Sequence, residues 1–361
     1  MKKIDILILY PEIMPYNLPV WRVLRDKGYR IKVVELSDKK LTPFQYQGEE
    51  GIEVCDIYTY KDYPSFQKDN LFENLKLLFV SEVFNVWYWR LAYYYHRKNR
   101  QLPIVLGSDA QWTGNLHNYL KKVFFRVTYR QVFTHVLCAG LWQVVYALKI
   151  GFKREQILTP LYCANNDEYY RVDISEKIGK YPKRFLFVGR LTEVKGIYEI
   201  VGAWQRIRNK RGWRLTMIGN GHLDSYLSQQ NDLEVLPFMS QNEICKIMQD
   251  SGCALIPSLY EPWGLVIHEA AAAGLPIIVS RNCGATNQFV QHGYNGLLVK
   301  EGDTETLRYS MEMIMDSSDE ELIAMSMRSR ELSKSIIPEC VASAYLSLIN
   351  SNPLPLAKNT K

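Results

Sequence analysis

The sequence has no cysteine pair, no long uncharged apolar run and no histidine cluster. Its seven cysteines are odd in number and scattered, without a C-x-x-C pair to indicate zinc or redox chemistry, and they are interpreted as reduced thiols. The first apolar run, residues 4–10, is too short for a signal peptide or membrane span, and no later stretch reaches spanning length without a charge. The six histidines lack metal-ligand spacing. These absences favour a cytoplasmic protein without disulfides or a metal centre.

Length and composition then indicate two domains. A chain of 361 residues exceeds the usual size of one compact domain, and 47% hydrophobic with 23% charged residues is ordinary for a globular protein. We therefore expect two cores with a cleft between them.

The basic excess lies entirely in the first half. Residues 1–165 carry 23 Lys and Arg against 15 Asp and Glu, whereas residues 166–361 carry 21 against 23. This asymmetry suggests that the first half faces an anionic partner, whether a phosphorylated acceptor, a membrane surface or nucleic acid. A merely soluble surface explains the charge equally well.

Short β-branched runs alternate with amphipathic helical stretches along the whole chain, which predicts parallel sheets with crossover helices. Strands are expected near residues 4–10, 31–36, 53–58, 103–106, 134–138, 184–188, 214–218, 233–236, 253–256, 275–279 and 296–299. A helix should run from near Asn17 to Gly28, another should follow a capping box at Ser240 and Glu243, and the last should begin near Pro338. The sequence therefore predicts an α/β protein with two Rossmann-like, doubly wound domains, at 1–165 and 166–337, followed by a helix and polar tail at 338–361.

The sharpest motif is residues 261–276, EPWGLVIHEAAAAGLP. It follows an apolar strand and opens a helix near Gly264, so Glu261 lies at the carboxyl end of the strand, where open α/β sheets bind ligands. Free N–H groups at the helix start, from Gly264 and Leu265 beside Trp263, favour phosphate oxygens, and carboxylates accept hydrogen bonds from sugar hydroxyls. Glu269 follows within the helix, on the side that could reach a ribose.

A second motif follows the strand at 184–188. Gly189 and Arg190 precede Lys195 by a few residues on a turn that leads into a helix, and the two cations can converge on a diphosphate. Charge of this sign is what a diphosphate leaving group needs. Gly219 and Gly221, after the next strand, form a further glycine turn that is weak evidence alone.

Together these motifs, over residues 183–305, resemble the retaining GT-B glycosyltransferases of family four (glycosyl transferases group 1). The resemblance implies that Glu261 holds hydroxyls of the donor sugar, Glu269 the ribose, and Arg190 and Lys195 the diphosphate. It also implies that the sugar is transferred with retention, without a covalent nucleophile, a metal ion or a cofactor other than the nucleotide diphosphate sugar, which is the donor substrate.

The first half conforms less well to the family. The glycine-rich loop that many members have after the first strand is replaced here by residues 10–17, which contain no glycine. Asp109 follows the strand near 103–106, where the family often has a His or Asp facing the reaction centre. A helix N-cap explains Asp109 about equally well, so both roles stay open.

A basic aromatic surface is expected between Arg90 and Arg130, where eight Lys and Arg accompany one acid. On the helix after Asp109 one stripe is interpreted as facing the core and a second, basic stripe as facing outward. The core-facing stripe comprises Leu116, Tyr119, Leu120, Val123 and Val127, and the basic one Lys122, Arg126 and Arg130. Contact with an anionic membrane is favoured slightly over a solvated face, and nucleic acid is ranked far lower.

These features predict an enzyme that passes a sugar to a glycan or lipid-linked acceptor during surface polysaccharide biosynthesis, in the cytoplasm or at the inner face of the cytoplasmic membrane. Two alternatives remain. One is a sugar-nucleotide epimerase or hydrolase on the same fold. The other is a sugar-nucleotide or glycan-binding protein without catalysis, which the glycine-poor first loop keeps open.

Overall fold

The computed structural model describes residues 3–36, 44–57 and 75–350, and they fold into two α/β units. Unit 1 comprises residues 1–162 and 338–361, and unit 2 comprises residues 163–337. The division falls after Tyr162, where we expected it after residue 165. The last helix, expected as a segment of its own, belongs to unit 1, and the expected polar tail lies outside the described residues.

Unit 1 is built on a parallel sheet with the strand order β3-β2-β1-β4-β5-β6-β7. The strands are β1 (Ile6–Leu9), β2 (Ile31–Glu35), β3 (Ile52–Asp56), β4 (Leu77–Val80), β5 (Ile104–Ser108), β6 (His135–Cys138) and β7 (Ile157–Leu158). Strand order reverses between β1 and β4. Because crossovers between parallel strands are right-handed, helices cover both faces of the sheet.

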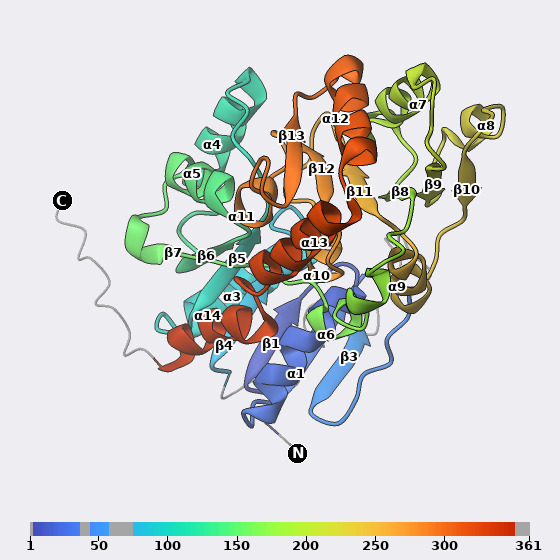
Figure 1. Cartoon of the computed structure of the whole chain (residues 1–361). Coiled ribbons are helices and arrows are strands. Elements are labelled where there is room, and N and C mark those ends of the chain that lie inside the picture. Colours follow the sequence, from blue (N-terminus) through green and yellow to red (C-terminus); the bar gives the residue numbers. More distant parts are fainter. Residues whose placement is uncertain (1–2, 37–43, 58–74, 351–361) are drawn as a thin grey trace. The chain divides into compact units, whose positions relative to one another are not determined.

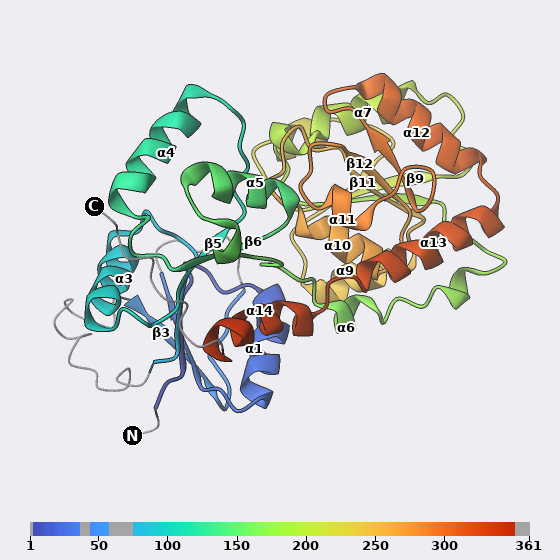
Figure 2. The same ribbon diagram turned by 90° about the vertical axis from the view of Figure 1, so that its left-hand side faces the viewer.

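The helices of unit 1 are α1 (Leu18–Asp26), α3 (Val86–Lys98), α4 (Leu116–Thr128), α5 (Leu141–Ile150) and α14 (Pro338–Asn350). Short 3-10 turns lie at Pro15–Asn17 and Arg154–Gln156. Helix α14 lies beside α1 (Figure 2). It also packs against β4, with the Tyr345 ring 5.5 Å from that of Phe79. The final helix therefore completes the cover on the α1 face of this sheet.

Unit 2 repeats the pattern with the strand order β10-β9-β8-β11-β12-β13, again parallel throughout. The strands are β8 (Arg184–Val188), β9 (Arg214–Ile218), β10 (Glu234–Leu236), β11 (Cys253–Ile256), β12 (Ile277–Ser280) and β13 (Gly296–Val299). The helices are α6 (Asn166–Tyr169), α7 (Ile197–Arg206), α8 (Asp224–Leu227), α9 (Gln241–Gln249), α10 (Leu265–Ala272), α11 (Thr286–Phe289), α12 (Thr304–Asp316) and α13 (Asp319–Ser333), with 3-10 turns at Ser175–Lys177 and Glu193–Lys195. Strand order reverses between β8 and β11, so this is a second doubly wound sheet.

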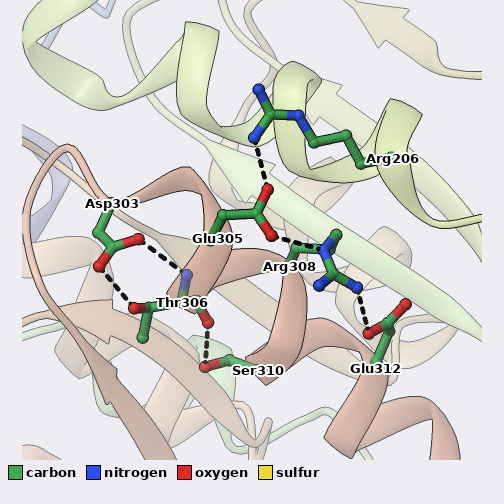
Figure 3. Close-up of polar contacts among 7 residues, drawn as sticks. All are labelled: Arg206, Asp303, Glu305, Thr306, Arg308, Ser310 and Glu312. Atoms are coloured by element: carbon green, nitrogen blue, oxygen red, sulfur yellow. Dashed lines mark hydrogen bonds and ion pairs between the residues drawn. The ribbon is translucent and has the colours of Figure 1, made fainter.

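Polar contacts fix the start of α12 against α7 (Figure 3). Asp303 caps the helix by accepting hydrogen bonds from the backbone N–H of Thr306, at 2.9 Å, and from its hydroxyl, at 2.7 Å. Glu305 of the first turn reaches Arg206 of α7 at 2.6 Å and also pairs with Arg308, at 3.1 Å. Because the Arg206 and Glu305 side chains are 57% and 50% exposed, the ion pair between the two helices contributes little to the stability of the unit.

In unit 2 the predicted strands agree closely with the observed ones. In unit 1 all five predicted strands are present. The capping box is confirmed, since Ser240 and Glu243 bond each other's backbone N–H groups, and the last helix begins at Pro338 as expected. Two strands of unit 1, β4 and β7, were not predicted. The four residues of β4 are apolar and fully buried, a pattern that does not separate a strand from a helical turn.

The predicted core-facing stripe of α4 is wrong. Leu116, Leu120, Val123 and Val127 are 62–75% exposed, and Tyr119 is 51% exposed, whereas Phe125 on the opposite side of the helix is buried. The sequence pattern identified an apolar face correctly but could not tell whether the face meets the core or the solvent. Helix α4 packs on the unit through Phe125, and the opposite side of the helix, which carries the apolar stripe, faces outward.

By length and composition alone, the stretch Asp319–Asn350 could cross a membrane. It is not one helix, because α13 ends at Ser333 and α14 begins at Pro338. Each of the two helices packs its buried side chains within its own unit, which is the behaviour of core helices.

Candidate functional site

The two central side chains of the predicted donor site meet in unit 2. Lys195 lies in the turn after β8 and Glu261 in the loop after β11, and the Lys195 ammonium contacts the Glu261 carboxylate. Their side chains are only 17% and 13% exposed. β8 and β11 are the neighbouring strands at which strand order reverses, so the contact lies where doubly wound sheets bind their ligands.

The two loops that carry Lys195 and Glu261 are fastened together by backbone. The N–H of Leu259 donates to the carbonyl of Val194 at 2.9 Å. Gly196 lies so close to Pro257 that a Cβ there would be 2.3 Å from the proline carbonyl oxygen. The carbonyl of Glu261 accepts a 3.1 Å hydrogen bond from the N–H of Gly284 in the loop after β12. Backbone contacts among the loops after β8, β11 and β12 thus fix the chain near both Lys195 and Glu261.

Gly264 gives Glu261 its place beside the start of α10. Gly264 has φ +86°, and a Cβ there would lie 2.8 Å from Cγ of Glu261. The helix that follows has no side-chain cap at its N-terminus. Leu265 and Val266 therefore present backbone N–H groups at the positive end of a helix, next to a carboxylate, which is an arrangement suited to phosphate oxygens and hydroxyl groups. Trp263, the remaining predicted contact in this turn, is 4% exposed.

The glycine turns after β8 and β9 pack on each other. A Cβ at Gly219 would lie 1.9 Å from the carbonyl oxygen of Gly189, and one at Gly221 would lie 2.1 Å from that of Leu191. The structure thus gives both predicted glycines a role in close backbone approach. Arg190 lies on the same turn and is exposed.

One ion pair of this region was missed in the sequence. Glu193 pairs with His222 at 2.5 Å, which links the turn after β8 to the turn after β9. His222 directly follows the glycine turn, but nothing in its own spacing marked it as a partner for Glu193.

Glu269 lies on α10, partly buried, beside two side chains that the sequence did not single out. It hydrogen-bonds with Tyr169 of α6 and Gln241 of α9. Burial raises the pKa of Glu269 to about 7, and these two hydrogen bonds oppose the shift. Tyr169 lies outside every motif recognised in the sequence, which is why sequence reasoning did not connect it with Glu269. A carboxylate with this pKa can hold or release a proton near neutral pH.

His268, the neighbour of Glu269, is fully buried and has a structural role. Its Nδ1 accepts from the backbone N–H of Ala164 at 3.1 Å, and its Nε2 donates to the carbonyl of Ser333 at 3.0 Å. The ring stacks on Phe289 with 4.0 Å between centroids. Burial lowers the pKa of His268 to about 4, so the imidazole is neutral and joins the first and last segments of unit 2 to α10.

Asp109 lies in unit 1, after β5, and is exposed. It is not the N-cap of α4, because that helix begins at Leu116 and Asn115 caps it by accepting from the N–H of Asn118. Tyr162 donates to the Asp109 carboxylate at 3.5 Å, and the Tyr162 ring makes an edge contact with Tyr16. Tyr16 of the first loop therefore approaches Asp109 only through Tyr162, which comes from the end of the segment before unit 2.

Within the residues that the structure describes, no three His, Cys, Asp or Glu side chains gather closely enough to hold a metal ion. The positive charges of the candidate site come from Arg190 and Lys195.

Most of unit 2 matches a known family model. Residues 172–331 match the family model described as glycosyl transferases group 1. An uncharacterized glycosyltransferase of Methanocaldococcus jannaschii is 30% identical over 140 residues, which are 37% of this chain and 36% of that protein. Glycogen synthase of Mycobacterium tuberculosis is 31% identical over 143 residues, 37% of this chain and 34% of that protein. This chain therefore aligns with about a third of the length of either relative.

A solved structure resembles the whole chain. Anabaena HepE in complex with UDP and glucose has a TM-score of 0.73 and 16% identity, and the match covers 97% of this chain and all of that one. The likeness confirms the GT-B fold that the sequence predicts.

Proposed function

Since residues 172–331 match the glycosyl transferases group 1 model, we propose that this protein is a retaining glycosyltransferase that uses a nucleotide diphosphate sugar. The observation that carries the proposal is the contact between Lys195 and Glu261 at the strand reversal of unit 2. A cation and a carboxylate side by side match the two ends of such a donor, which presents phosphate oxygens next to sugar hydroxyls.

The roles of the side chains follow from their chemistry. Arg190 and Lys195 bind the diphosphate, while Glu261 accepts hydrogen bonds from hydroxyls of the donor sugar. Glu269 accepts hydrogen bonds from the ribose. The backbone of Gly189, Gly219, Gly221, Gly264 and Leu265, with Trp263 beside it, lines the nucleotide and phosphate path. Without a donor, Lys195 and Glu261 neutralise each other, and the donor replaces each partner by a group of matching charge or polarity.

The proposed reaction exchanges one bond at the anomeric carbon for another on the same face. The bond from the anomeric carbon to the diphosphate oxygen breaks, and a bond to the acceptor oxygen forms. The departing diphosphate oxygen takes the proton of the acceptor hydroxyl. Arg190 and Lys195 stabilise the charge that develops on the diphosphate, so a divalent ion is not needed for this step.

The acceptor is proposed to be a glycan or a lipid-linked sugar that unit 1 presents, with Asp109 as the candidate polar contact at that side. A place in surface polysaccharide biosynthesis agrees with the basic surface of unit 1. We propose that the protein acts in the cytoplasm, in peripheral contact with the anionic inner face of the cytoplasmic membrane. Nucleic acid is not proposed as a partner.

The proposal is tested by thermal stabilisation of the purified protein with nucleoside diphosphates and their sugars. UDP and UDP-glucose come first, because Anabaena HepE was crystallised with UDP and glucose. A donor at 100 times its Kd adds about 2.7 kcal/mol to the free energy of unfolding. We expect a rise in Tm with one nucleotide family, and its loss in Lys195→Ala and in Glu269→Ala.

Product analysis then separates transfer from the alternatives. Glycosyl transfer with retention, unchanged by EDTA, supports the proposal. Conversion or cleavage of the donor without an acceptor would point to an epimerase or hydrolase. Tight donor binding without turnover across many acceptors would favour a binding protein, and no stabilisation by any nucleotide would contradict the donor site itself.

A further inference from the structure

The outward surface of α4 is apolar, although its side chains stay exposed among the described residues of the chain. Leu116, Leu120 and Val127 are 75%, 62% and 70% exposed. At 100° per residue these side chains lie on one stripe, opposite the buried Phe125 and Asn118. A helix of a soluble protein usually points such a stripe at its core, so this face invites an apolar partner.

Helix α5 lies beside α4 and also exposes apolar side chains. The consecutive crossovers β5-α4-β6 and β6-α5-β7 run in one direction along the sheet, so both helices lie on the same face of it, and they contact each other (Figures 1 and 2). On α5, Leu141, Trp142 and Leu148 are 64%, 45% and 44% exposed. We call the surface formed by both helices the apolar face; it comprises Leu116, Tyr119, Leu120, Val123, Val127, Leu141, Trp142 and Leu148.

The surroundings of the apolar face carry charge of one sign. Residues 110–154, which include both helices, contain seven Lys and Arg and no Asp or Glu. At 100° per residue, Lys121 and Lys122 lie between the stripe and the buried Phe125, one on each side of α4, and their ammonium groups lie 5.7 Å and 6.0 Å from the ring centres of Phe84 and Trp112. Arg126 flanks it toward α5, where its guanidinium donates to the carbonyl of Lys149 at 3.4 Å. The face is therefore apolar at its centre and basic at its edges.

We propose that the apolar face docks unit 1 onto an anionic bilayer, with α4 lying along the membrane surface. An apolar stripe that enters the headgroup region between basic side chains is the arrangement of interfacial helices. With 13 residues, α4 is about 20 Å long, too short to cross a hydrocarbon core of about 30 Å. The inference rests on the proposed function only for the membrane contact named there, and it does not require sugar transfer.

A second copy of the chain fits this face less well. Two copies that met through it would bring two sets of Lys and Arg together without an acid in residues 110–154 of either. Like charges at short range oppose such an association. An anionic lipid surface, in contrast, satisfies the apolar centre and the basic edges at once.

The test is co-sedimentation of the full chain with phosphatidylcholine vesicles, with and without a quarter of phosphatidylglycerol. Two double variants probe the face: L120S/V127S removes apolar side chains, and K121Q/K122Q removes charge. Matched controls are Met327→Ser on α13, which is 53% exposed, and Lys246→Gln on α9, which is also exposed. Because every substituted side chain is wholly or partly exposed, the variants should fold, which their Tm values check.

We expect the wild-type protein to bind the anionic vesicles at least tenfold more tightly than the neutral ones. Each double variant should weaken anionic-vesicle binding about tenfold, and neither control should change it. K121Q/K122Q should also flatten the dependence on salt concentration.

Absence of vesicle binding, or binding that L120S/V127S leaves unchanged, would overturn the inference. A wild-type dimer that light scattering shows to dissociate in L120S/V127S, without vesicle binding, would assign the face to self-association. Donor-induced stabilisation, measured on the same samples, separates the two proposals: intact donor binding without vesicle binding defeats only the docking face, and the reverse defeats only the donor site.

Discussion

The ammonium group of Lys195 and the carboxylate of Glu261 neutralise each other across two loops that are 66 residues apart in the chain. Both side chains are mostly buried, so removal of either one would leave the charge of the other without its partner.

Replacement of Lys195 should lower donor affinity, which the loss of an exposed ion pair elsewhere in the unit should not. We expect Lys195→Ala to weaken donor binding by about 10- to 100-fold, because it removes a charge-assisted contact to the diphosphate worth about 1.5–3 kcal/mol. Isothermal titration with the donor identified by thermal stabilisation measures the change.

Arg206→Ala is the matched control, since Arg206 forms an exposed ion pair with Glu305 on the surface of the same unit (Figure 3). The free energy of unfolding of the Arg206→Ala variant should fall by no more than about 1 kcal/mol, and its donor affinity should stay unchanged. Equal losses of donor affinity in both variants would argue against a specific role for Lys195.

Donor affinity should rise with pH around neutrality. The pKa of Glu269 is raised to about 7, and hydroxyl groups of the ribose donate more strongly to its ionised form than to the protonated one. A nucleotide diphosphate sugar has no terminal phosphate that titrates here, so Glu269 should dominate the profile. We expect Kd for such a sugar to fall about tenfold between pH 6 and pH 8, as measured by titration calorimetry.

The Glu269→Gln variant supplies the control for this profile. Its affinity should be lower and nearly independent of pH in the same interval. The raised pKa also means that Glu269 contributes stability below pH 4.5 that is lost as the pH rises through about 7, so without donor Glu269→Gln should weaken that decline. A wild-type profile that the variant reproduces would exclude Glu269 as its source.

A side chain at Gly264 should both destabilise the fold, through backbone strain, and impair donor binding. Gly264→Ala forces a left-handed residue and places Cβ 2.8 Å from Glu261 Cγ. We expect a destabilisation of about 1–2 kcal/mol from the backbone and a further 1–3 kcal/mol from the clash, together with loss of donor stabilisation.

Gly293→Ala isolates the backbone part of this effect. Gly293 has φ +74°, and a Cβ there meets no atom within 4 Å. The Gly293→Ala variant should lose only the stability that the left-handed backbone costs, and it should bind donor normally. Thermal unfolding with and without donor measures both. If both variants lost donor binding, the effect would not come from displacement of Glu261.

His268 should make the protein sensitive to acid. Its pKa is about 4 in the folded protein against an ordinary 6.5, so its contribution is present above pH 6.5 and is lost as the pH falls toward 4, by up to about 3 kcal/mol. Urea-induced unfolding at pH 7.5 and pH 5 measures this loss.

Two substitutions of His268 sharpen the test. His268→Gln retains one acceptor and one donor and should be less destabilised at pH 7.5 than His268→Leu, which leaves the N–H of Ala164 and the carbonyl of Ser333 unpaired. Both variants should lose less stability than the wild type between pH 7.5 and pH 5. A wild-type pH dependence in His268→Leu would contradict the assignment.

The sequence predicted the parts of the molecule whose pattern is local. Strands such as Arg184–Val188 and Cys253–Ile256 are short apolar runs between turn residues, and the Ser240 capping box needs only four consecutive residues. The motifs around Lys195 and Glu261 were visible because each is contiguous. Strand topology then explains why the two meet, since the ends of adjacent parallel strands share one edge of the sheet.

What the sequence did not reveal depends on pairing between distant segments. Tyr169 and Glu269 are 100 positions apart, and only the packing of α6 against α10 brings them together. The stripe of α4 is a similar case, because periodicity shows that a helix has an apolar face but not what that face contacts. β4 was missed because four buried residues carry no alternation to count.

Helix α14 has a consequence for the order in which the polypeptide acquires its structure during synthesis. It belongs to unit 1, yet the ribosome makes it after the whole of unit 2. Unit 2 is one continuous segment that can fold as soon as it emerges, whereas the sheet that contains the N-terminal strands lacks its cover over β4 until Val341, Tyr345 and Leu348 arrive. Although its first residues are translated earliest, unit 1 is the last of the two to be completed.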